Sequence, residues 1–370
     1  MAWVDLAPEG NVVRILSIDG GGIRGIIPAR FLVELEEITG QRIADLFDIV
    51  AGTSTGALIA LGLVCPGPDG RPALTAEDVQ KIYVLDSPDL FPAVKVRRVV
   101  QPGGWVRARP NIYQRIGAVV FPRRFGNARY RANGLEAIIR RNLGEARIAD
   151  AVTDVVVPTY DWKAGRSMIF SSRAARDGEG PNPTMAAVAR GTTAAPTYFP
   201  PLKTTLEDGR EVILIDGGVA ANNPVTCAYA EALLWEQRLA RDLDVMVVSL
   251  GTGRPPEEIP TYEELWSRGW LRLGMGMLNV VFDGTSEISD EMIRTIILKQ
   301  EPNSRYWRFN TELRGVSLRL DDSSDQNLAG LLRLAQTMIA DQREALEDLA
   351  GLLVKQVPCL APRPATGPRT

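Results

Sequence analysis

Short apolar runs alternate with helical patterns along most of this chain. Val12–Ile18 is a β-rich run that ends in a glycine loop, after which apolar residues recur at helical spacing. In a second unit, Leu46–Ala51 is predicted as a strand and Ala57–Leu63 as a buried helix. Further strands are predicted at Val155–Tyr160, Ser167–Ser171, Val212–Ile215 and Asp244–Leu250. This alternation predicts an α/β fold with a parallel sheet covered by helices.

Two later segments have helical patterns. Asn223 and Pro224 are predicted as the N-cap and first residue of a helix that extends to Trp235. Apolar residues at helical spacing in Asp325–Lys355 predict a structural helix. No internal repeat is visible, and the proline-rich residues 357–370 are predicted to form a flexible tail.

Composition places the chain among ordinary globular proteins. It has 370 residues, of which 45% are hydrophobic, enough for one large domain or two. The three cysteines are odd in number and far apart, which indicates neither a disulfide framework nor a metal cluster. Residues 1–10 lack the features of a signal peptide, and no apolar run approaches the length of a membrane span. We therefore expect a cytoplasmic protein, with peripheral membrane contact as an open alternative.

The candidate chemistry begins with a serine between glycines, in Gly52-Thr53-Ser54-Thr55-Gly56. Ser54 lies where a predicted strand turns into a helix, whose N-terminal amides favour developing negative charge. The chain contains no histidine, so a Ser-His-Asp triad is excluded. A base for Ser54 must therefore be a carboxylate, a lysine, a tyrosine or a water held by one of them.

Three consecutive glycines in Asp19–Gly25 follow the first strand. Such a loop can direct backbone N–H groups at an oxyanion or a phosphate. The spacing of a dinucleotide site fits Gly20, Gly22 and Gly25, but the acid expected about 20 residues later falls in a helical stretch. A Walker loop is excluded because no Gly-Lys-Ser/Thr follows. The serine turn next along the chain favours an oxyanion hole.

A third glycine turn carries the candidate base. The run Val212–Ile215 leads directly to Asp216, which precedes Gly217 and Gly218. In a parallel sheet this carboxylate would emerge at the carboxyl edge, beside the other two glycine turns. A lone Asp-Gly turn without chemistry is the alternative, and the other two motifs favour catalysis.

Positive charge is concentrated in one segment, although the net charge is only −3. Leu90–Arg131 contains ten cations and no acid, interleaved with apolar residues. Three interpretations stay open: solvated loops and short helices, an anionic lipid interface, or a binding site for a phosphorylated small molecule.

Together, the three motifs resemble the signature blocks of the patatin-like phospholipases. Further stretches are similar to plant patatins, namely Ile26–Ala29, Ala194–Pro200, Val219–Pro224 and Ser249–Gly253, and weak similarity continues through Asp321–Lys355. The resemblance implies a three-layer α/β/α fold with a mostly parallel central sheet, related to cytosolic phospholipase A2. It also implies hydrolysis of fatty-acyl esters in phospholipids by a Ser-Asp dyad, without calcium, another metal or a cofactor.

By this resemblance Ser54 is the nucleophile and Asp216 the base. The oxyanion-stabilising residues are Gly20, Gly21, Gly22 and Arg24. Arg24 either holds the loop through backbone carbonyls or places a positive charge near the oxyanion. The implied organisation is a lead-in at 1–10, a patatin-like catalytic core at 11–254, a C-terminal helical part of the same domain at 255–356, and the tail.

Other interpretations stay open beside this one. Trp266–Leu278 is rich in glycine, methionine and aromatic residues, as in an acyl channel, a lid or a packed helix. The segment 90–131 is a candidate for contact with anionic membranes. Bacterial relatives of similar sequence act as antiphage effectors switched on by cyclic oligonucleotides, so a cyclic nucleotide activator is an alternative, but a nucleic acid polymer is not expected. Two further alternatives to a lipid hydrolase are a non-catalytic lipid-binding module and a dinucleotide oxidoreductase.

Overall fold

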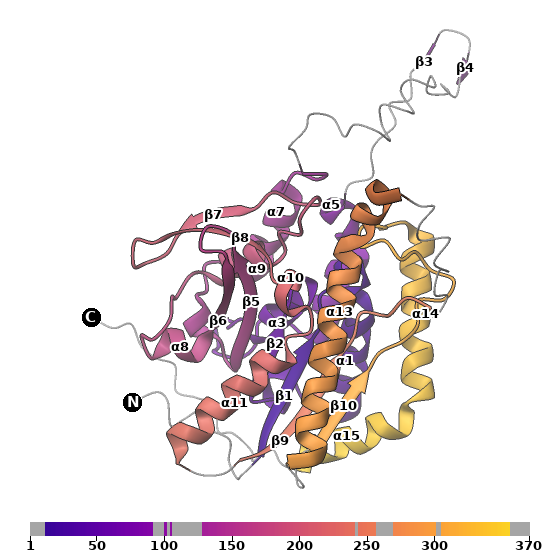
Figure 1. Ribbon diagram of the computed structural model, residues 1–370. Coiled ribbons are helices and arrows are strands. Elements are labelled where there is room, and N and C mark those ends of the chain that lie inside the picture. The colour runs from indigo at the N-terminus through magenta and orange to yellow at the C-terminus, as the bar shows by residue number, and fades with distance from the viewer. Residues whose placement is uncertain are drawn as a thin grey trace.

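A computed structural model of the protein has helices on both faces of one sheet (Figure 1). The structure describes residues 12–91, 100–101, 104–105, 128–240, 243–256, 269–300 and 305–355. Its eight-stranded sheet consists of β1 (Val12–Ile18), β2 (Ile49–Gly52), β5 (Asp154–Asp161), β6 (Arg166–Ser171), β7 (Leu202–Thr205), β8 (Glu211–Asp216), β9 (Asp244–Leu250) and β10 (Arg305–Phe309). A separate antiparallel pair consists of β3 (Val100–Gln101) and β4 (Gly104–Trp105).

The strand order is β10-β9-β1-β2-β5-β8-β7, with β6 also paired to β5. The pairs from β10 to β5 are parallel, whereas β8 and β6 run antiparallel to β5, and β7 antiparallel to β8. The mostly parallel sheet is thus confirmed, with an antiparallel part beyond β5. Short connections account for the β5–β6 and β7–β8 pairs, because consecutive strands joined by a few residues pair antiparallel.

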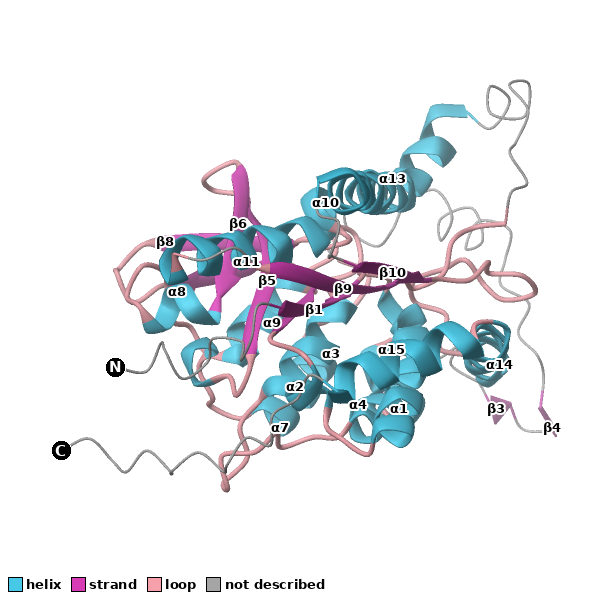
Figure 2. Cartoon of the chain, turned by 90° about the horizontal axis from the view of Figure 1, so that it is seen from below, coloured by secondary structure: helices cyan, strands magenta, loops and turns pink. Residues whose placement is uncertain are grey.

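Helices enclose the sheet in two outer layers, which Figure 2 shows edge-on. One layer contains α1 (Ile26–Thr39), α3 (Thr55–Val64), α4 (Ala76–Leu85), α7 (Asn133–Leu143), α9 (Met185–Thr192), α14 (Asp325–Asp341) and α15 (Arg343–Lys355). The opposite layer contains α10 (Gly218–Ala221), α11 (Val225–Leu239) and α13 (Gly269–Gln300). Shorter elements are α2 (Ile43–Leu46), α5 (Ser87–Leu90), α8 (Ser172–Arg176) and 3₁₀ turns at Gly22–Gly25 and Ile148–Asp150.

Strand β1 lies between two apolar cores. Val13 and Ile15 pack toward the core shared with α11 and α13, while Leu16 and Ile18 pack into the larger core beneath α1 and α3. All four side chains are fully buried. Burying one such side chain contributes about 1.5–3 kcal/mol, so a strand covered on both faces is mostly apolar.

Three predicted helix boundaries differ from the structure. The expected single helix at 325–355 is two helices that meet at Gln342, and no proline or glycine marks the break. Helix α11 begins at Val225, one residue later than predicted, although Asn223 Oδ1 accepts the Val225 N–H as expected of a cap. In 266–278, the residues from Gly269 onward belong to α13, while 266–268 and the side chains through 277 lie outside the described residues.

Candidate active site

Ser54 occupies the sharp turn between β2 and α3. Its backbone has φ 54° and ψ −118°, an uncommon conformation for a residue with a side chain. The flanking glycines make the turn sterically feasible: a Cβ on Gly52 would lie 2.2 Å from the Gly56 carbonyl oxygen, and one on Gly56 would lie 2.2 Å from the Ile18 carbonyl oxygen. The glycine frame therefore presents Ser54 at the N-terminus of α3, where the helix favours negative charge.

Asp216 lies at the end of β8 and is fully buried. Its Oδ2 accepts a hydrogen bond of 2.6 Å from Ser54 Oγ, and its Oδ1 accepts one of 2.8 Å from the Gly218 N–H. The structure thus brings together the two side chains that the sequence places 162 residues apart.

Sheet register explains how an antiparallel strand reaches the serine. Ala51 of β2 pairs with Val156 of β5, and Thr159, three residues further along β5, pairs with Asp216 of β8. Ser54 follows Ala51 by the same three residues, in the turn after β2. Asp216 therefore lies beside the serine turn as expected, but β8 approaches from the opposite direction to that of a parallel strand. A one-residue shift would point its side chain to the other face of the sheet.

Burial changes the acid-base chemistry of this carboxyl group. Desolvation raises the pKa of Asp216 from 3.8 to about 7, against the hydrogen bonds from Ser54 and Gly218, which lower it. Within the described part of the chain, no charged partner contributes to this shift. The group is thus a stronger base than an ordinary carboxylate, as a group that takes a proton from a serine must be.

We expect ester hydrolysis to require ionised Asp216. The kcat/KM for a soluble ester should fall about tenfold per pH unit below an apparent pKa near 7 and reach a plateau above it, because protonated Asp216 cannot accept the serine proton. Initial rates between pH 5 and 9 measure this limb. A kcat/KM that stays flat down to pH 5 would mean that Asp216 keeps its ordinary pKa near 4.

The glycine loop lies against the serine, and a Cβ on Gly20 would lie 3.4 Å from Ser54 Cβ. The Gly20 N–H donates to the Asn222 carbonyl at 2.9 Å. The N–H groups of Gly21 and Gly22, by contrast, donate to no group in the described part of the chain. Gly22 lines the same cavity as Ser54 and Asp216. These two amides are therefore the free donors of the loop.

Arg24 is buried beneath the loop and donates from Nε to the Gly21 carbonyl at 3.3 Å. Burial lowers the pKa of its guanidinium, and the nearby Asp283 partly offsets this effect. The contact with Gly21 matches the first of the two roles considered for Arg24, in which it supports the loop.

We expect Arg24→Ala to lower kcat by roughly a hundredfold, the order of magnitude of losing one oxyanion donor, because the Gly21 peptide would lose its support. Arg24→Lys keeps a donor without the planar fork, and should cost about tenfold or less. Arg30→Ala, which removes a partly buried pair with Glu34 in α1, is the matched control for turnover and thermal stability. Unchanged kcat in Arg24→Ala would remove this residue from the site.

Several supporting residues were not assigned a role from the sequence. Thr192 Oγ1 accepts the Ser54 N–H at 3.0 Å, and the Ala194 carbonyl accepts the Asp216 N–H at 3.1 Å. Thr252 Oγ1 donates to the Gly20 carbonyl at 2.7 Å, and Asn222 Nδ2 donates to the same oxygen at 3.3 Å. Three of the four lie in the patatin-similar stretches 194–200, 219–224 and 249–253, which was the only signal available.

At its first residue, the glycine loop is fixed by a buried ion pair. Arg308 of β10 donates to both carboxylate oxygens of Asp19, at 2.9 and 2.6 Å, and also to Ser249. Bidentate pairs of this kind fix orientation as well as charge. Strand β10, which the sequence pattern did not predict, thus anchors the start of the loop.

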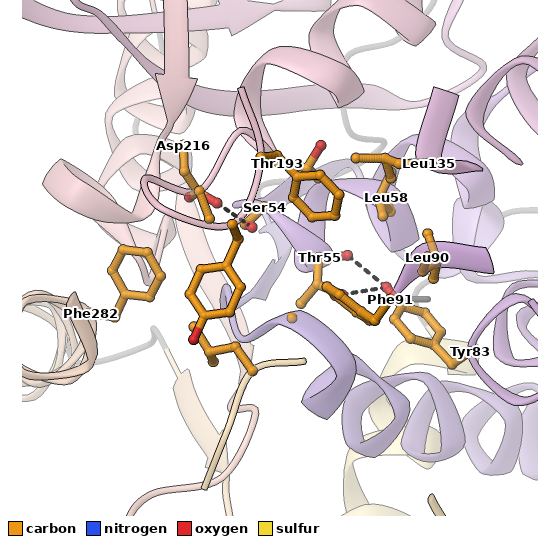
Figure 3. Close-up of a pocket in the computed structure, with 15 residues that line it drawn as sticks. Ser54, Thr55, Leu58, Tyr83, Leu90, Phe91, Leu135, Thr193, Asp216 and Phe282 are labelled. Atoms are coloured by element: carbon orange, nitrogen blue, oxygen red, sulfur yellow. Dashed lines mark hydrogen bonds between the residues drawn. The ribbon is translucent and has the colours of Figure 1, made fainter. Parts of the chain in front are cut away.

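An apolar cavity opens beside the dyad (Figure 3). Its walls surround about 530 Å³ when open solvent is included, but a water-sized sphere has room for its centre in only about 40 Å³, so the cavity is narrow. Ser54 and Asp216 lie side by side in its wall and point toward each other, with Phe282 on one side and Leu58, Leu90 and Leu135 on the other. Its remaining apolar lining comes from Tyr83, Phe91, Ala195, Tyr198, Phe199 and Leu320. Such a lining suits a hydrocarbon chain.

Most of the basic segment lies outside the described residues. Of its ten cations, only Arg129 and Arg131 are described. Arg129 forms an ion pair of 2.7 Å with Asp321, so this cation has a counter-charge that the segment itself does not supply. The interpretations of residues 92–99 and 106–127 therefore stay predictions.

The described residues contain neither a candidate membrane span nor a candidate metal cluster. Within them, no helix combines the length and the apolar character needed to cross a bilayer. The same part of the chain holds no cluster of three or more histidine, cysteine, aspartate or glutamate side chains suited to a metal ion.

Comparison with known proteins gives one consistent result. Residues 16–229 match the family described as patatin-like phospholipase. Patatin-like protein 2 from Oryza sativa subsp. indica is 31% identical, over 92% of this chain and 86% of the relative. Patatin-like protein 3 from Arabidopsis thaliana is 31% identical, over 89% and 81%. Among solved structures, VipD from Legionella pneumophila matches 89% of this chain and 68% of its own, at 13% identity and a TM-score of 0.37, too low to add to the assignment.

Proposed function

Because the chain belongs to the patatin-like phospholipase family, we propose that it hydrolyses fatty-acyl esters of phospholipids through Ser54 and Asp216. The observation that carries this proposal is the 2.6 Å hydrogen bond between the serine hydroxyl and a buried carboxylate with a raised pKa. An apolar cavity at the same two residues supports a lipid acyl group as the substrate. The proposed class is a serine carboxylic-ester hydrolase.

In the proposed first half-reaction, Asp216 Oδ2 takes the proton of Ser54 as Oγ attacks the ester carbonyl carbon. The negative charge that develops on the carbonyl oxygen would be stabilised by the free N–H groups of Gly21 and Gly22. When the tetrahedral intermediate collapses, the alcohol portion of the lipid takes the proton from Asp216 and leaves. The acyl group then remains on Ser54 Oγ.

The second half-reaction repeats these proton transfers with water. Ionised Asp216 accepts one proton of the attacking water, whose oxygen adds to the acyl carbon. Collapse of this second intermediate returns the proton to Ser54 Oγ and releases the fatty acid. One carboxylate thus serves both steps, which explains how a chain without histidine can carry out acyl transfer.

Two alternatives fit the described residues less well. A non-catalytic lipid-binding module would not need the dyad contact. A dinucleotide oxidoreductase would need a ribose-binding acid on a second strand, but residues 35–45 form the end of α1, a turn and most of α2. The cyclic-nucleotide-activated effector and the anionic-membrane contact both concern the basic segment, and stay open as outcomes of the test.

Incubating the purified chain with a panel of phosphatidylcholine, phosphatidylglycerol, phosphatidylethanolamine and diacylglycerol vesicles tests the proposal. We expect fatty acid release, measured by mass spectrometry, that EGTA does not reduce. Parallel samples with cyclic dinucleotides reveal any activation, and samples at low and high salt reveal dependence on anionic lipid. No acyl release from any lipid, with Ser54 unreactive toward a fluorophosphonate, would contradict the proposed function.

A further inference from the structure

One buried hydroxyl contacts the backbone of the Ser54 turn and the strand that pairs with the strand of Asp216. Thr192 is the last residue of α9 and is fully buried. Its Oγ1 accepts the Ser54 N–H at 3.0 Å and donates to the Pro158 carbonyl of β5 at 2.7 Å. Two residues later, the Ala194 carbonyl accepts the Asp216 N–H at 3.1 Å. The end of α9 thus contacts the backbone of both proposed catalytic residues.

The contact at Ser54 matters because that residue is in an unfavourable backbone conformation. Its φ of 54° persists only if surrounding groups fix it, and a serine lacks the freedom of glycine. The neighbouring Thr53 forms two hydrogen bonds. Its N–H donates to the Ile18 carbonyl at 3.2 Å, and its hydroxyl donates to the Ala221 carbonyl at 2.7 Å. At Ser54 itself, the backbone N–H is held by Thr192.

The second contact links this hydroxyl to the turn that carries Asp216. A Cβ on Gly217 would lie 2.2 Å from the Pro158 carbonyl oxygen, so the turn packs directly on the group that Thr192 binds. Helix α9 also fits tightly on β8, since a Cβ on Gly191 would lie 2.8 Å from Leu214 Cδ1. Thr192 is therefore fixed relative to the strand of the base as well as to the serine.

We propose that Thr192 is a positioning residue for the Ser54-Asp216 pair, because its one hydroxyl joins the serine backbone N–H to the strand carbonyl on which the Asp216 turn packs. The inference rests on the proposed function and goes beyond it by assigning a residue that contacts neither substrate nor reacting atoms. The neighbouring Thr193 illustrates the contrast, since its hydroxyl donates to the Ala189 carbonyl of its own helix, as in many helices.

Thr192→Val tests the role, because valine keeps the shape and removes the hydroxyl. We expect kcat for a short p-nitrophenyl ester to fall about ten- to a hundredfold with KM within twofold, as a small displacement of a reacting group can cause. Phosphonylation of Ser54 by a fluorophosphonate should slow by a similar factor. Thr192→Ser, which restores the hydroxyl, should retain kcat within about threefold.

The pH profile supplies a readout that a purely structural role would not change. The hydrogen bond from Ser54 lowers the pKa of Asp216, so displacement of the serine should move the acid limb of the Thr192→Val profile to higher pH. The matched control is Thr153→Val. It removes another buried hydroxyl that donates to a carbonyl, that of Ala44 at 2.6 Å, at the opposite end of β5.

The control should lose stability but keep kcat and its pH profile. Wild-type kcat in Thr192→Val would overturn the positioning role. So would a fall in kcat no larger than the fraction of unfolded protein, or a Thr192→Ser variant with kcat as low as that of Thr192→Val. If Ser54→Ala is inactive in the same experiment, the proposed function stands despite such a result; an active Ser54→Ala would overturn the proposed function itself. Should valine prevent folding, Thr192→Ala takes its place in the same comparison.

Discussion

Replacing Ser54 by alanine should lower the kcat of ester hydrolysis by about 10⁴-fold or more, and Asp216→Asn should have an effect of similar size. The reason is geometric: the 2.6 Å contact joins the proposed nucleophile and the proposed base, so losing either would stop proton transfer. Hydrolysis of a soluble p-nitrophenyl ester measures the effect. The double variant should be no less active than either single one, because the losses do not add.

Stability distinguishes loss of chemistry from loss of fold. The folded state binds the Asp216 proton more tightly than the unfolded chain, because burial raises this pKa from 3.8 to about 7. The stability that the neutral carboxyl group provides is complete below about pH 4 and is lost as the pH rises through about 7.

Asp216→Asn should therefore be at least as stable as the native chain at pH 8. The gain has an upper bound of about 4 kcal/mol, from a shift of roughly three pKa units. It should vanish near pH 4, which thermal unfolding at the two values can measure. An inactive Asn variant that unfolds at a lower temperature than the native chain at pH 8 would contradict the burial of a charged Asp216.

Gly22→Ala should also have a large effect and lower the kcat of ester hydrolysis by at least about a hundredfold. Gly22 has φ +58°, and an added Cβ would lie 2.3 Å from the carbonyl oxygen of Leu320. That oxygen already accepts the Ile23 N–H at 2.9 Å, so neither backbone can move without displacing the loop. The N–H groups of Gly21 and Gly22, the proposed oxyanion donors, would then be displaced, and the expected cost is that of losing one or two such donors.

Gly40→Ala is the control for backbone strain alone. Gly40 has φ +66° at the end of α1, but nothing lies within 4 Å of the added Cβ. In both variants the positive φ destabilises the folded state by about 1–2 kcal/mol, because alanine disfavours the left-handed conformation. Only the alanine at position 22 would also clash with a backbone oxygen. Equal turnover in the two variants, measured under saturating ester, would mean that the glycine loop does not stabilise the reaction.

The strands were predictable from sequence where burial on both faces leaves an unambiguous apolar run. The predictions for β1 and β9 match the structure to the residue. In contrast, β7 was missed because its burial alternates between half-buried and exposed residues, and β10 because four of its five residues are exposed or half-buried. The break at Gln342 was missed because helical periodicity continues through it.

The sequence by itself determined the chemistry available to this protein. A serine between glycines, three consecutive glycines after a strand and an aspartate after an apolar run are local patterns, and the absence of histidine is a fact of composition. Such local patterns can be recognised from the sequence, because each depends on the steric and electronic properties of a few adjacent residues.

Only the tertiary structure decided how these groups meet. The antiparallel direction of β8, the register that brings Asp216 beside the serine turn, and the burial that raises the Asp216 pKa all depend on residues far apart in the chain. The same holds for Arg308 on Asp19 and for Thr192 on the Ser54 amide. Hydrogen bonds and desolvation act over a few ångströms in space, so their partners cannot be assigned from sequence separation.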